Sequence, residues 1–143
     1  RDIMVASRTV ARSTTADAIV AAAREIAETV DIKAICCFTQ SGNTAALVAR
    51  ERPRVPILAL TPLVGVARRM CLISGCHCYV TGEVTRFKGA VVSAARTARD
   101  GGYATEEDQI IVTAGVPFNV QGSTNILRVA PCAERLIYAS DPE

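Results

Sequence analysis

The chain has 143 residues, of which 50% are hydrophobic and 21% are charged, values typical of one globular domain rather than of a disordered or fibrous chain. The 16 basic and 14 acidic residues leave a formal net charge of +2, too small for the basic footprint of a nucleic-acid-binding protein. No apolar run approaches the roughly 18 residues of a membrane span, and no signal-peptide layout is present. We therefore expect neither nucleic acid nor membrane as a partner.

Residues 1–13 show no clean period, and we interpret them as a lead-in or linker before a domain that spans residues 14–143. A start at Arg1, without a Met, is consistent with a piece of a longer chain. From Thr14 onward apolar residues recur at steps of three and four, which predicts an amphipathic helix capped by Thr14 or Thr15. The apolar stripe consists of Ala16, Ile19, Val20, Ala23, Ile26, Ala27 and Val30.

The next segments alternate between strand and helix patterns. Residues 33–38 form a short apolar run, typical of a strand buried on both faces of a parallel sheet. A helix is predicted over residues 43–52 and is ended by Pro53, and a second strand over residues 56–60. Thr61-Pro62 then predicts a helix start, with Thr61 as the cap and Pro62 as the first helical residue.

The second half of the chain continues the alternation of helix and strand patterns up to a fourth strand. We predict that the third helix stops at Gly75, followed by a strand over residues 77–80 and a helix from Phe87 to the Gly101-Gly102 pair. The β-branched residues 109–114 predict a fourth strand.

The last predicted strand covers residues 125–129, after a loop rich in glycine and proline. No helix fits in that loop, so this strand should run antiparallel to the fourth, because a parallel crossover needs about a dozen residues or more. The pattern as a whole predicts an α/β protein, a three-layer α/β/α sandwich with a mainly parallel five-stranded sheet and an antiparallel last strand.

A possible anion-binding turn follows the first strand. Its residues are Thr39, Gln40, Ser41, Gly42, Asn43 and Thr44. A glycine-bearing turn that leads into a helix presents unpaired backbone N–H groups and a partial positive charge, and the hydroxyls add further donors. The same residues are also ordinary turn and cap chemistry, so from spacing alone both interpretations stay open. In parallel sheets ligands collect at the carboxyl ends of strands, where this turn and the final loop begin.

The cysteines do not suggest a disulfide framework or a metal site. Cys36, Cys37, Cys71, Cys76, Cys78 and Cys132 lie mostly in apolar runs, and we interpret them as reduced thiols. In Cys76-His77-Cys78 the two cysteines share one strand face and His77 faces the other way, which does not suit zinc.

No catalytic residues are predicted. His77, the only histidine, is expected to be a packed ring within a strand, and Cys36 and Cys37 sit in the middle of another strand, where a reactive thiolate is not favoured. The chain has neither a Walker motif nor a G-x-G-x-x-G motif.

Several motifs together resemble the C-terminal domain of pyruvate kinase. The resemblance runs from about Thr14 to Val129. It is carried by Thr39-Gln40-Ser41-Gly42-Asn43-Thr44, Arg52-Pro53, Thr61-Pro62 and Ala67-Arg68-Arg69, and by the ending Thr113-Ala114-Gly115-Val116-Pro117 with Gly122-Ser123-Thr124-Asn125-Ile126-Leu127-Arg128-Val129, which is similar to bacterial-type members.

The resemblance implies a regulatory rather than a catalytic module. In the family the catalytic residues and the Mg²⁺ and K⁺ ions belong to a catalytic barrel that this chain lacks, so no cofactor is expected here. The implied partners are a sugar phosphate or nucleoside monophosphate effector, the protein's own catalytic barrel and the other subunits of a homotetramer, in a cytoplasmic protein.

The resemblance also implies where the effector binds. One phosphate would lie on residues 39–44, and a final loop would close over it. That loop consists of Val116, Pro117, Phe118, Asn119, Val120, Gln121 and Gly122. Related proteins often hold a second phosphate with a Trp, and this chain has none. An effector with one phosphate is therefore as plausible from the sequence as a bisphosphate.

Two alternatives belong to other classes of protein. One is a free-standing α/β enzyme that acts on a phosphorylated small molecule through a cysteine, serine or threonine nucleophile. The other is a structural assembly module whose turn at residues 39–44 binds nothing.

Overall fold

The structure is a computed structural model, and it describes residues 14–73, 75–116, 118 and 124–141. The predicted lead-in, residues 1–13, lies outside the described residues. The elements follow in the order α2 (Thr15–Thr29), β1 (Ile32–Phe38), α3 (Asn43–Arg50), β2 (Ile57–Thr61), α4 (Val64–Met70), β3 (Cys76–Val80), α5 (Phe87–Asp100), β4 (Gln109–Ala114), β5 (Ile126–Pro131) and α6 (Glu134–Ser140).

The five strands form one sheet in the order β3-β2-β1-β4-β5. β1 lies in the centre and pairs in parallel with β2 and β4, and β3 extends the parallel part at one edge. β5 pairs with β4 in antiparallel fashion, as predicted from the absence of a helix between them. The parallel strands therefore end at one edge of the sheet, where their connecting loops meet.

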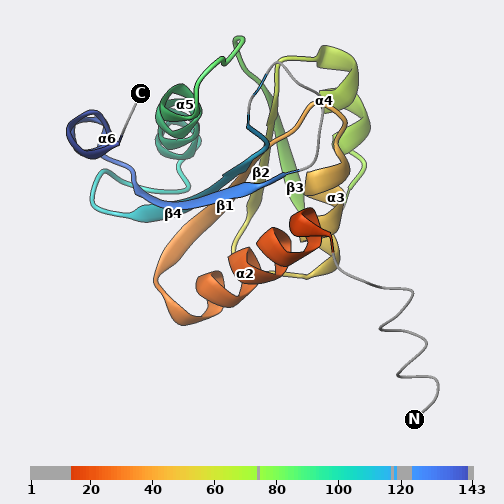
Figure 1. Cartoon of the computed structure of the whole chain (residues 1–143), viewed down its shortest axis with the longest axis horizontal. Helices are drawn as coiled ribbons and strands as arrows, with labels where there is room; N and C mark the ends of the chain where they lie inside the picture. Colours follow the sequence, from red (N-terminus) through yellow and green to blue (C-terminus); the bar gives the residue numbers. More distant parts are fainter. Residues whose placement is uncertain (1–13, 74, 117, 119–123, 142–143) are drawn as a thin grey trace.

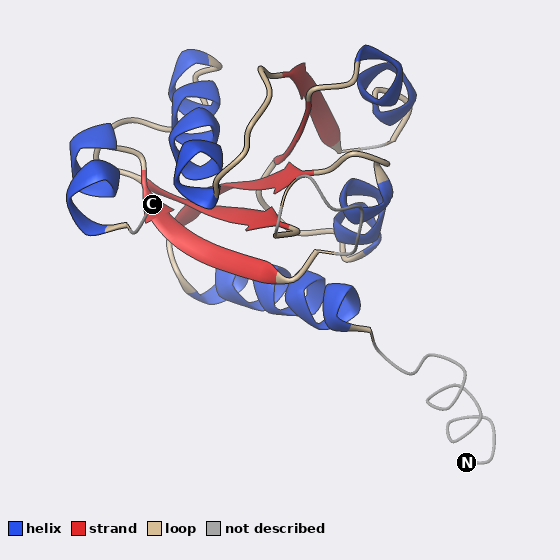
Figure 2. Ribbon diagram, turned by 45° about the horizontal axis from the view of Figure 1, so that its top comes forward, coloured by secondary structure: helices blue, strands red, loops and turns tan. Residues whose placement is uncertain are grey.

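Helices cover both faces of the sheet, which confirms the three-layer prediction. In Figure 1, α2 and α5 lie on opposite sides of the strands, and the ribbon in Figure 2 shows the same arrangement. One core contains α5, α6 and the sheet residues beneath them, including Cys36, Leu58 and Ile110. The second core lies under α2, α3 and α4 and includes Ile35 and Ile111. β1 is buried on both faces because it supplies side chains to both cores.

The helix ends agree with the sequence patterns at two places. Thr14, not Thr15, caps α2: its hydroxyl accepts a hydrogen bond from the Asp17 N–H, and the Asp17 carboxylate accepts one from the Thr14 N–H. α5 ends at Asp100 with Gly101 as its C-cap, and Gly102 has a φ of 79°, a backbone conformation that favours glycine. Helix α3 ends at Arg50, slightly before the predicted stop at Pro53.

The prediction of a helix start at Thr61-Pro62 is wrong. Thr61 is the last residue of β2, is fully buried and pairs with Val80 of β3. Its hydroxyl oxygen accepts a hydrogen bond from the Leu63 N–H at 3.2 Å, and α4 begins at Val64. Pairing in the sheet keeps Thr61 extended and so overrides its preference for a helix cap. The sequence patterns also missed α6, a seven-residue helix after β5.

Candidate functional site

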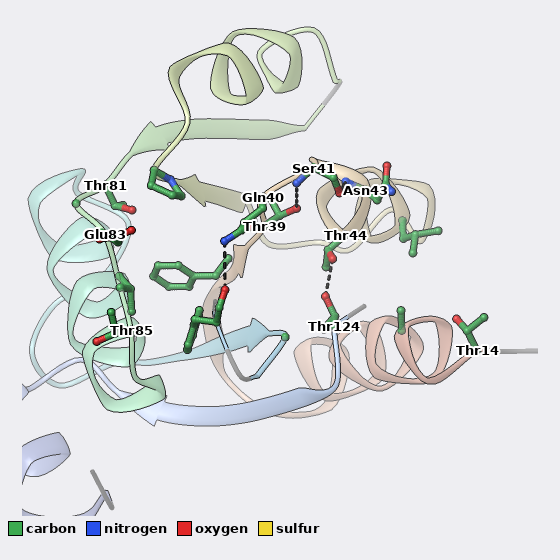
Figure 3. A pocket seen from close by; sticks show the side chains of 18 residues that line it. Thr14, Thr39, Gln40, Ser41, Asn43, Thr44, Thr81, Glu83, Thr85 and Thr124 are labelled. Atoms are coloured by element: carbon green, nitrogen blue, oxygen red, sulfur yellow. Dashed lines mark hydrogen bonds between the residues drawn. The ribbon is translucent and has the colours of Figure 1, made fainter. Parts of the chain in front are cut away.

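A cavity of about 460 Å³ opens at the carboxyl ends of the parallel strands. One side is formed by the β1–α3 connection and the first turn of α3, with Thr39, Gln40, Ser41, Asn43 and Thr44. The β3–α5 connection, residues 81–85, lines the opposite side, and further lining comes from the start of α2, from residues that follow β4 and from Thr124 (Figure 3). Segments that are far apart in the sequence thus share one cavity.

The β1–α3 turn is shaped by its own hydroxyl groups. The Thr39 Oγ1 atom accepts hydrogen bonds from the N–H groups of Ser41 and Gly42, at 3.3 and 2.8 Å, and the Ser41 Oγ atom accepts one from the Asn43 N–H at 3.2 Å. These contacts satisfy backbone donors at the start of α3 that the helix leaves without partners. Each hydroxyl keeps its own O–H for donation to a bound group.

Gly42 caps α3 and fixes the direction of the turn. Its φ is 90°, in the left-handed region, and it makes no side-chain cap. A Cβ atom at this position would lie 3.2 Å from the Cγ atom of Met70 in α4. Gly42 is not among the residues that line the cavity, and its predicted contact with an effector stays a prediction.

Two buried threonines join the turn to the end of the final loop. The hydroxyls of Thr44 and Thr124 share a short hydrogen bond, and their residues are 8% and 3% exposed. Both line the cavity, as Figure 3 shows. A group that binds Thr44 therefore also lies close to the segment that precedes β5.

The described part of the final loop also contacts the turn. The Gln40 Nε2 atom donates a hydrogen bond to the Phe118 carbonyl at 3.2 Å. The rings of Phe118 and Phe38 pack edge to face, with their centroids 6.4 Å apart. Val116 is held by a pair of hydrogen bonds between its backbone and the Asn125 side-chain amide, at 2.9 and 2.8 Å. The other predicted loop residues, namely Pro117, Asn119, Val120, Gln121 and Gly122, lie outside the described residues.

The cavity is nearly uncharged. Among its described lining residues Glu83 is the one charged side chain, and none is Lys or Arg. The sequence adds no basic residue at positions 117 and 119–123. Attraction of an anion would therefore depend on hydroxyls and on the partial positive charge of the α3 N-terminus, which is equivalent to roughly half an elementary charge.

Sequence reasoning missed the polar residues that line the cavity outside the turn. These are Thr14, Thr81, Glu83, Thr85 and Thr124. The rule that ligands gather at the carboxyl ends of parallel strands could have selected residues 81–85, because they directly follow β3. It could not have shown that β3 lies on the same side of β1 as β2, which the strand order decides.

Within the described residues the side chains considered for catalysis lie apart. His77 is exposed on the edge strand β3, with its ring centroid 5.4 Å from that of Tyr103, so the predicted packed ring is wrong. Cys36 and Cys37 are fully buried, and burial raises the pKa of Cys37 to about 12 and that of Cys36 well above its usual range. Both thiols therefore stay protonated at neutral pH.

All six cysteines are free thiols. The side chains of Cys76 and Cys78 pack toward α4, as the alternation along the strand predicts. The described part of the chain contains no group of three metal-ligating side chains. None of its helices has both the length and the apolar character to cross a bilayer.

Comparison with known proteins matches residues 17–130 to the family model described as pyruvate kinase, alpha/beta domain. A pyruvate kinase of Methylorubrum extorquens is 38% identical over 128 residues, which are 90% of this chain and 27% of that protein. A pyruvate kinase of Geobacillus stearothermophilus is 33% identical over 129 residues, 90% of this chain and 22% of that protein. The chain spans about a quarter of the length of the curated relatives it matches.

Comparison of the fold with solved structures also leads to pyruvate kinases. A structure of Cryptosporidium parvum pyruvate kinase in complex with ADP superimposes with a TM-score of 0.76 and 29% identity, over 84% of this chain and 24% of that one. The mainly parallel five-stranded sheet with helices on both faces places the chain in the class of α/β sandwich domains. The chain belongs to the pyruvate kinase family and contains that family's C-terminal alpha/beta domain.

Proposed function

We propose that this domain binds a small phosphorylated effector in the cavity at the carboxyl edge and thereby regulates a pyruvate kinase. The reaction of the whole enzyme, phosphoryl transfer from phosphoenolpyruvate to ADP, would then take place outside this chain. The observation that carries the proposal is the meeting of the α3 N-terminus with the final-loop segment around one cavity, through Gln40 and Phe118 and through Thr44 and Thr124.

The phosphate would lie at the first turn of α3. The first bond within this helix runs from the Ala46 N–H to the Gly42 carbonyl, so the N–H groups of Thr44 and Ala45 have no acceptor in the helix. These two groups, the Ser41 hydroxyl and the Thr44 hydroxyl form a set of neutral donors suited to phosphate oxygens. Thr44 would exchange its bond with Thr124 for one with the ligand or donate to both.

The rest of the ligand would extend toward Glu83. A carboxylate accepts hydrogen bonds from sugar hydroxyls but repels a second phosphate. A volume of about 460 Å³ falls in the usual range for small-molecule sites. We therefore propose a sugar monophosphate or nucleoside monophosphate with free hydroxyls, rather than a bisphosphate.

Calorimetry with glucose 6-phosphate, ribose 5-phosphate and AMP tests the phosphate position. Ser41→Ala and Thr44→Val should each weaken binding about tenfold or more, because a hydrogen bond to a charged group contributes about 1.5–3 kcal/mol. The wild-type protein should gain about 2.7 kcal/mol of stability at a ligand concentration of a hundred times Kd.

Thr29→Val is the matched control, since Thr29 lies at the far end of α2 and its hydroxyl bonds only to helix carbonyls. It should leave the affinity unchanged. Equal affinities of the wild type and of both cavity variants would show that the ligand binds elsewhere. No binding of any phosphorylated compound would favour the structural assembly module.

The preference for one phosphate is tested by Glu83→Gln. This change keeps the size of the side chain and removes its charge, so it should improve the affinity for fructose 1,6-bisphosphate relative to that for fructose 6-phosphate. A ratio of affinities that stays the same in the variant would contradict the role of Glu83.

The proposal includes contacts with a catalytic barrel and with other copies of the chain. It is supported by large apolar side chains that remain exposed around α4 and β3, among them Leu63, Val64, Leu72 and Val80. Sedimentation equilibrium should show self-association that increases with concentration. A monomer at every concentration would limit these contacts to the rest of the enzyme.

A further inference from the structure

A second cavity lies at the opposite end of the parallel strands from the first. Its volume is about 710 Å³, and it opens between α3, the connection from α3 to β2 and the residues that precede β3. Residues 52–56 of that connection all line it. The cavity therefore lies at the amino ends of β2 and β3, whereas the first cavity lies at the carboxyl ends of the strands.

This second cavity is positively charged. Arg50, Arg52 and Arg54 line it, and its described lining contains neither Asp nor Glu. Within the described part of the chain, none of the three guanidinium groups forms an ion pair or a side-chain hydrogen bond. Three cationic groups thus share one cavity without a carboxylate that neutralises them, and their donors are available to a bound anion.

The backbone that carries these arginines is held in place. At its start the Arg52 N–H donates a hydrogen bond to the Ala49 carbonyl at 3.1 Å, and at its end the Pro56 carbonyl accepts one from the Ile35 N–H at 3.0 Å. Pro53 and Pro56 each fix one backbone φ angle within the connection. A connection that is already ordered lowers the entropic cost of binding a ligand.

Arg52 occupies a position that local folding does not favour for it. Its φ is 52°, and it is the one non-glycine residue with a positive φ in the part of the chain that the structure describes. It directly follows Glu51, the C-cap of α3, at a position where glycine or asparagine most often adopts this conformation. An arginine there costs backbone energy, and a charge that lines the cavity gives a reason for it.

We propose that the second cavity binds a small anion that carries a diphosphate group. A guanidinium pairs with phosphate oxygens through two parallel N–H···O bonds. A diphosphate spreads its charge over two phosphates and so can meet more than one arginine at once, which a single carboxylate cannot. The first cavity does not compete for such an anion, because it contains Glu83 and no described basic residue.

Two sources of the diphosphate group are compatible with this chemistry, inorganic pyrophosphate and a nucleoside diphosphate. Most of the remaining lining is apolar and consists of Ala46, Ala49, Val55, Ile57 and Ile73. An apolar wall can pack against a base, so tighter binding of ADP than of pyrophosphate would identify the nucleotide as the source. Equal affinities would mean that the phosphates alone are recognised.

Calorimetry with pyrophosphate tests the proposal. Binding should be saturable at low ionic strength, at least about tenfold tighter than that of orthophosphate, and much weaker at about 0.5 M NaCl, because salt screens interactions with exposed charges. Arg50→Gln and Arg54→Gln should each weaken it about tenfold. Arg52→Gly should do the same, and glycine adopts the left-handed conformation without strain, so this variant removes the charge and leaves the turn intact.

Arg68→Gln is the matched control, because Arg68 is exposed on α4 and does not line the second cavity. It should leave the affinity for pyrophosphate unchanged, and thermal unfolding without ligand shows that each variant is folded. The proposal is overturned if pyrophosphate does not bind, if orthophosphate binds as tightly, or if the three cavity variants keep the wild-type affinity. An equal loss in Arg68→Gln would also overturn it, since the attraction would then come from the overall charge of the chain.

Discussion

Gly42 occupies a position where both backbone and space favour glycine. Its φ of 90° is one that residues with a side chain rarely adopt, and its missing side chain makes room for Met70. The Met70 side chain is flexible, so the backbone conformation is the larger obstacle to substitution. The shape of the turn at residues 39–44 thus depends on one residue that does not line the cavity.

Gly42→Ala should destabilise the protein by about 1–2 kcal/mol, the cost of a left-handed conformation for a residue with a Cβ. Gly65→Ala is the matched control: Gly65 lies exposed in α4 with open space around it, and alanine there should stabilise by up to about 1 kcal/mol. Urea unfolding measures both. Equal effects of the two changes would contradict this account of Gly42.

The elements at the end of the chain are held by a carboxylate and two arginines. Glu134, in the first turn of α6, accepts hydrogen bonds from the Arg96 Nε and Nη2 atoms at 2.8 and 2.9 Å and from the Arg99 Nη2 atom at 2.6 Å. Arg99 also donates to the Cys132 carbonyl at 2.7 Å, so this cluster joins α5, α6 and the end of β5. A short helix that would not be stable alone is thereby fixed to the fold.

This cluster predicts a dependence of stability on pH. The hydrogen bonds from Arg96 and then Arg99 lower the pKa of Glu134 from its ordinary value of 4.5 to about 2. A lowered pKa contributes stability that is present above the unfolded-state pKa and is lost as the pH falls through the folded-state pKa. The contribution should therefore disappear between about pH 5 and pH 2.

Glu134→Gln should cost about 1 kcal/mol at neutral pH, because solvent screens the pair with Arg96, whose side chain is 59% exposed, more than the pair with Arg99. Urea unfolding at about pH 7, 5 and 3 measures the difference from the wild type, which should shrink at the lowest pH. Glu106→Gln, in an exposed turn, is the control and should change little. A difference that grows on acidification would have the wrong sign and would refute the role of the ion pairs.

At the scale of the whole molecule, stability comes from two cores that share the sheet. Leu58, on β2, is fully buried under α5, whereas Leu72, just beyond α4, is 88% exposed. The two leucines lie close in sequence and have the same side chain. Only their places relative to the cores distinguish them.

Leu58→Ala and Leu72→Ala therefore form a matched pair. The first should destabilise the protein by about 3 kcal/mol through lost burial and a cavity, and the second should change stability by less than about 0.5 kcal/mol. Chemical unfolding measures both in the same buffer. A large loss in Leu72→Ala would mean that Leu72 is covered in solution, for instance by another copy of the chain.

The sequence by itself determined the elements whose signals are local. The apolar run at residues 33–38, the stripe beginning at Ala16 and the missing helix before residue 125 led to β1, α2 and the antiparallel β5. Residues of the motif at 39–44 line one wall of the cavity, and their binding of an effector stays a prediction. The predictions of β1, α2 and β5 succeeded because periodicity and loop length act within one segment.

Only the tertiary structure decided which segments far apart in the sequence lie next to one another. It brought Glu83 and Thr124 to the turn at residues 39–44, kept Thr61 extended by pairing it with β3, and left His77 on an exposed edge. Strand order sets these neighbours, and strand order follows from the packing of both sheet faces as a whole. No local pattern contains that information, because the free energy that selects it comes from contacts between residues far apart in the chain.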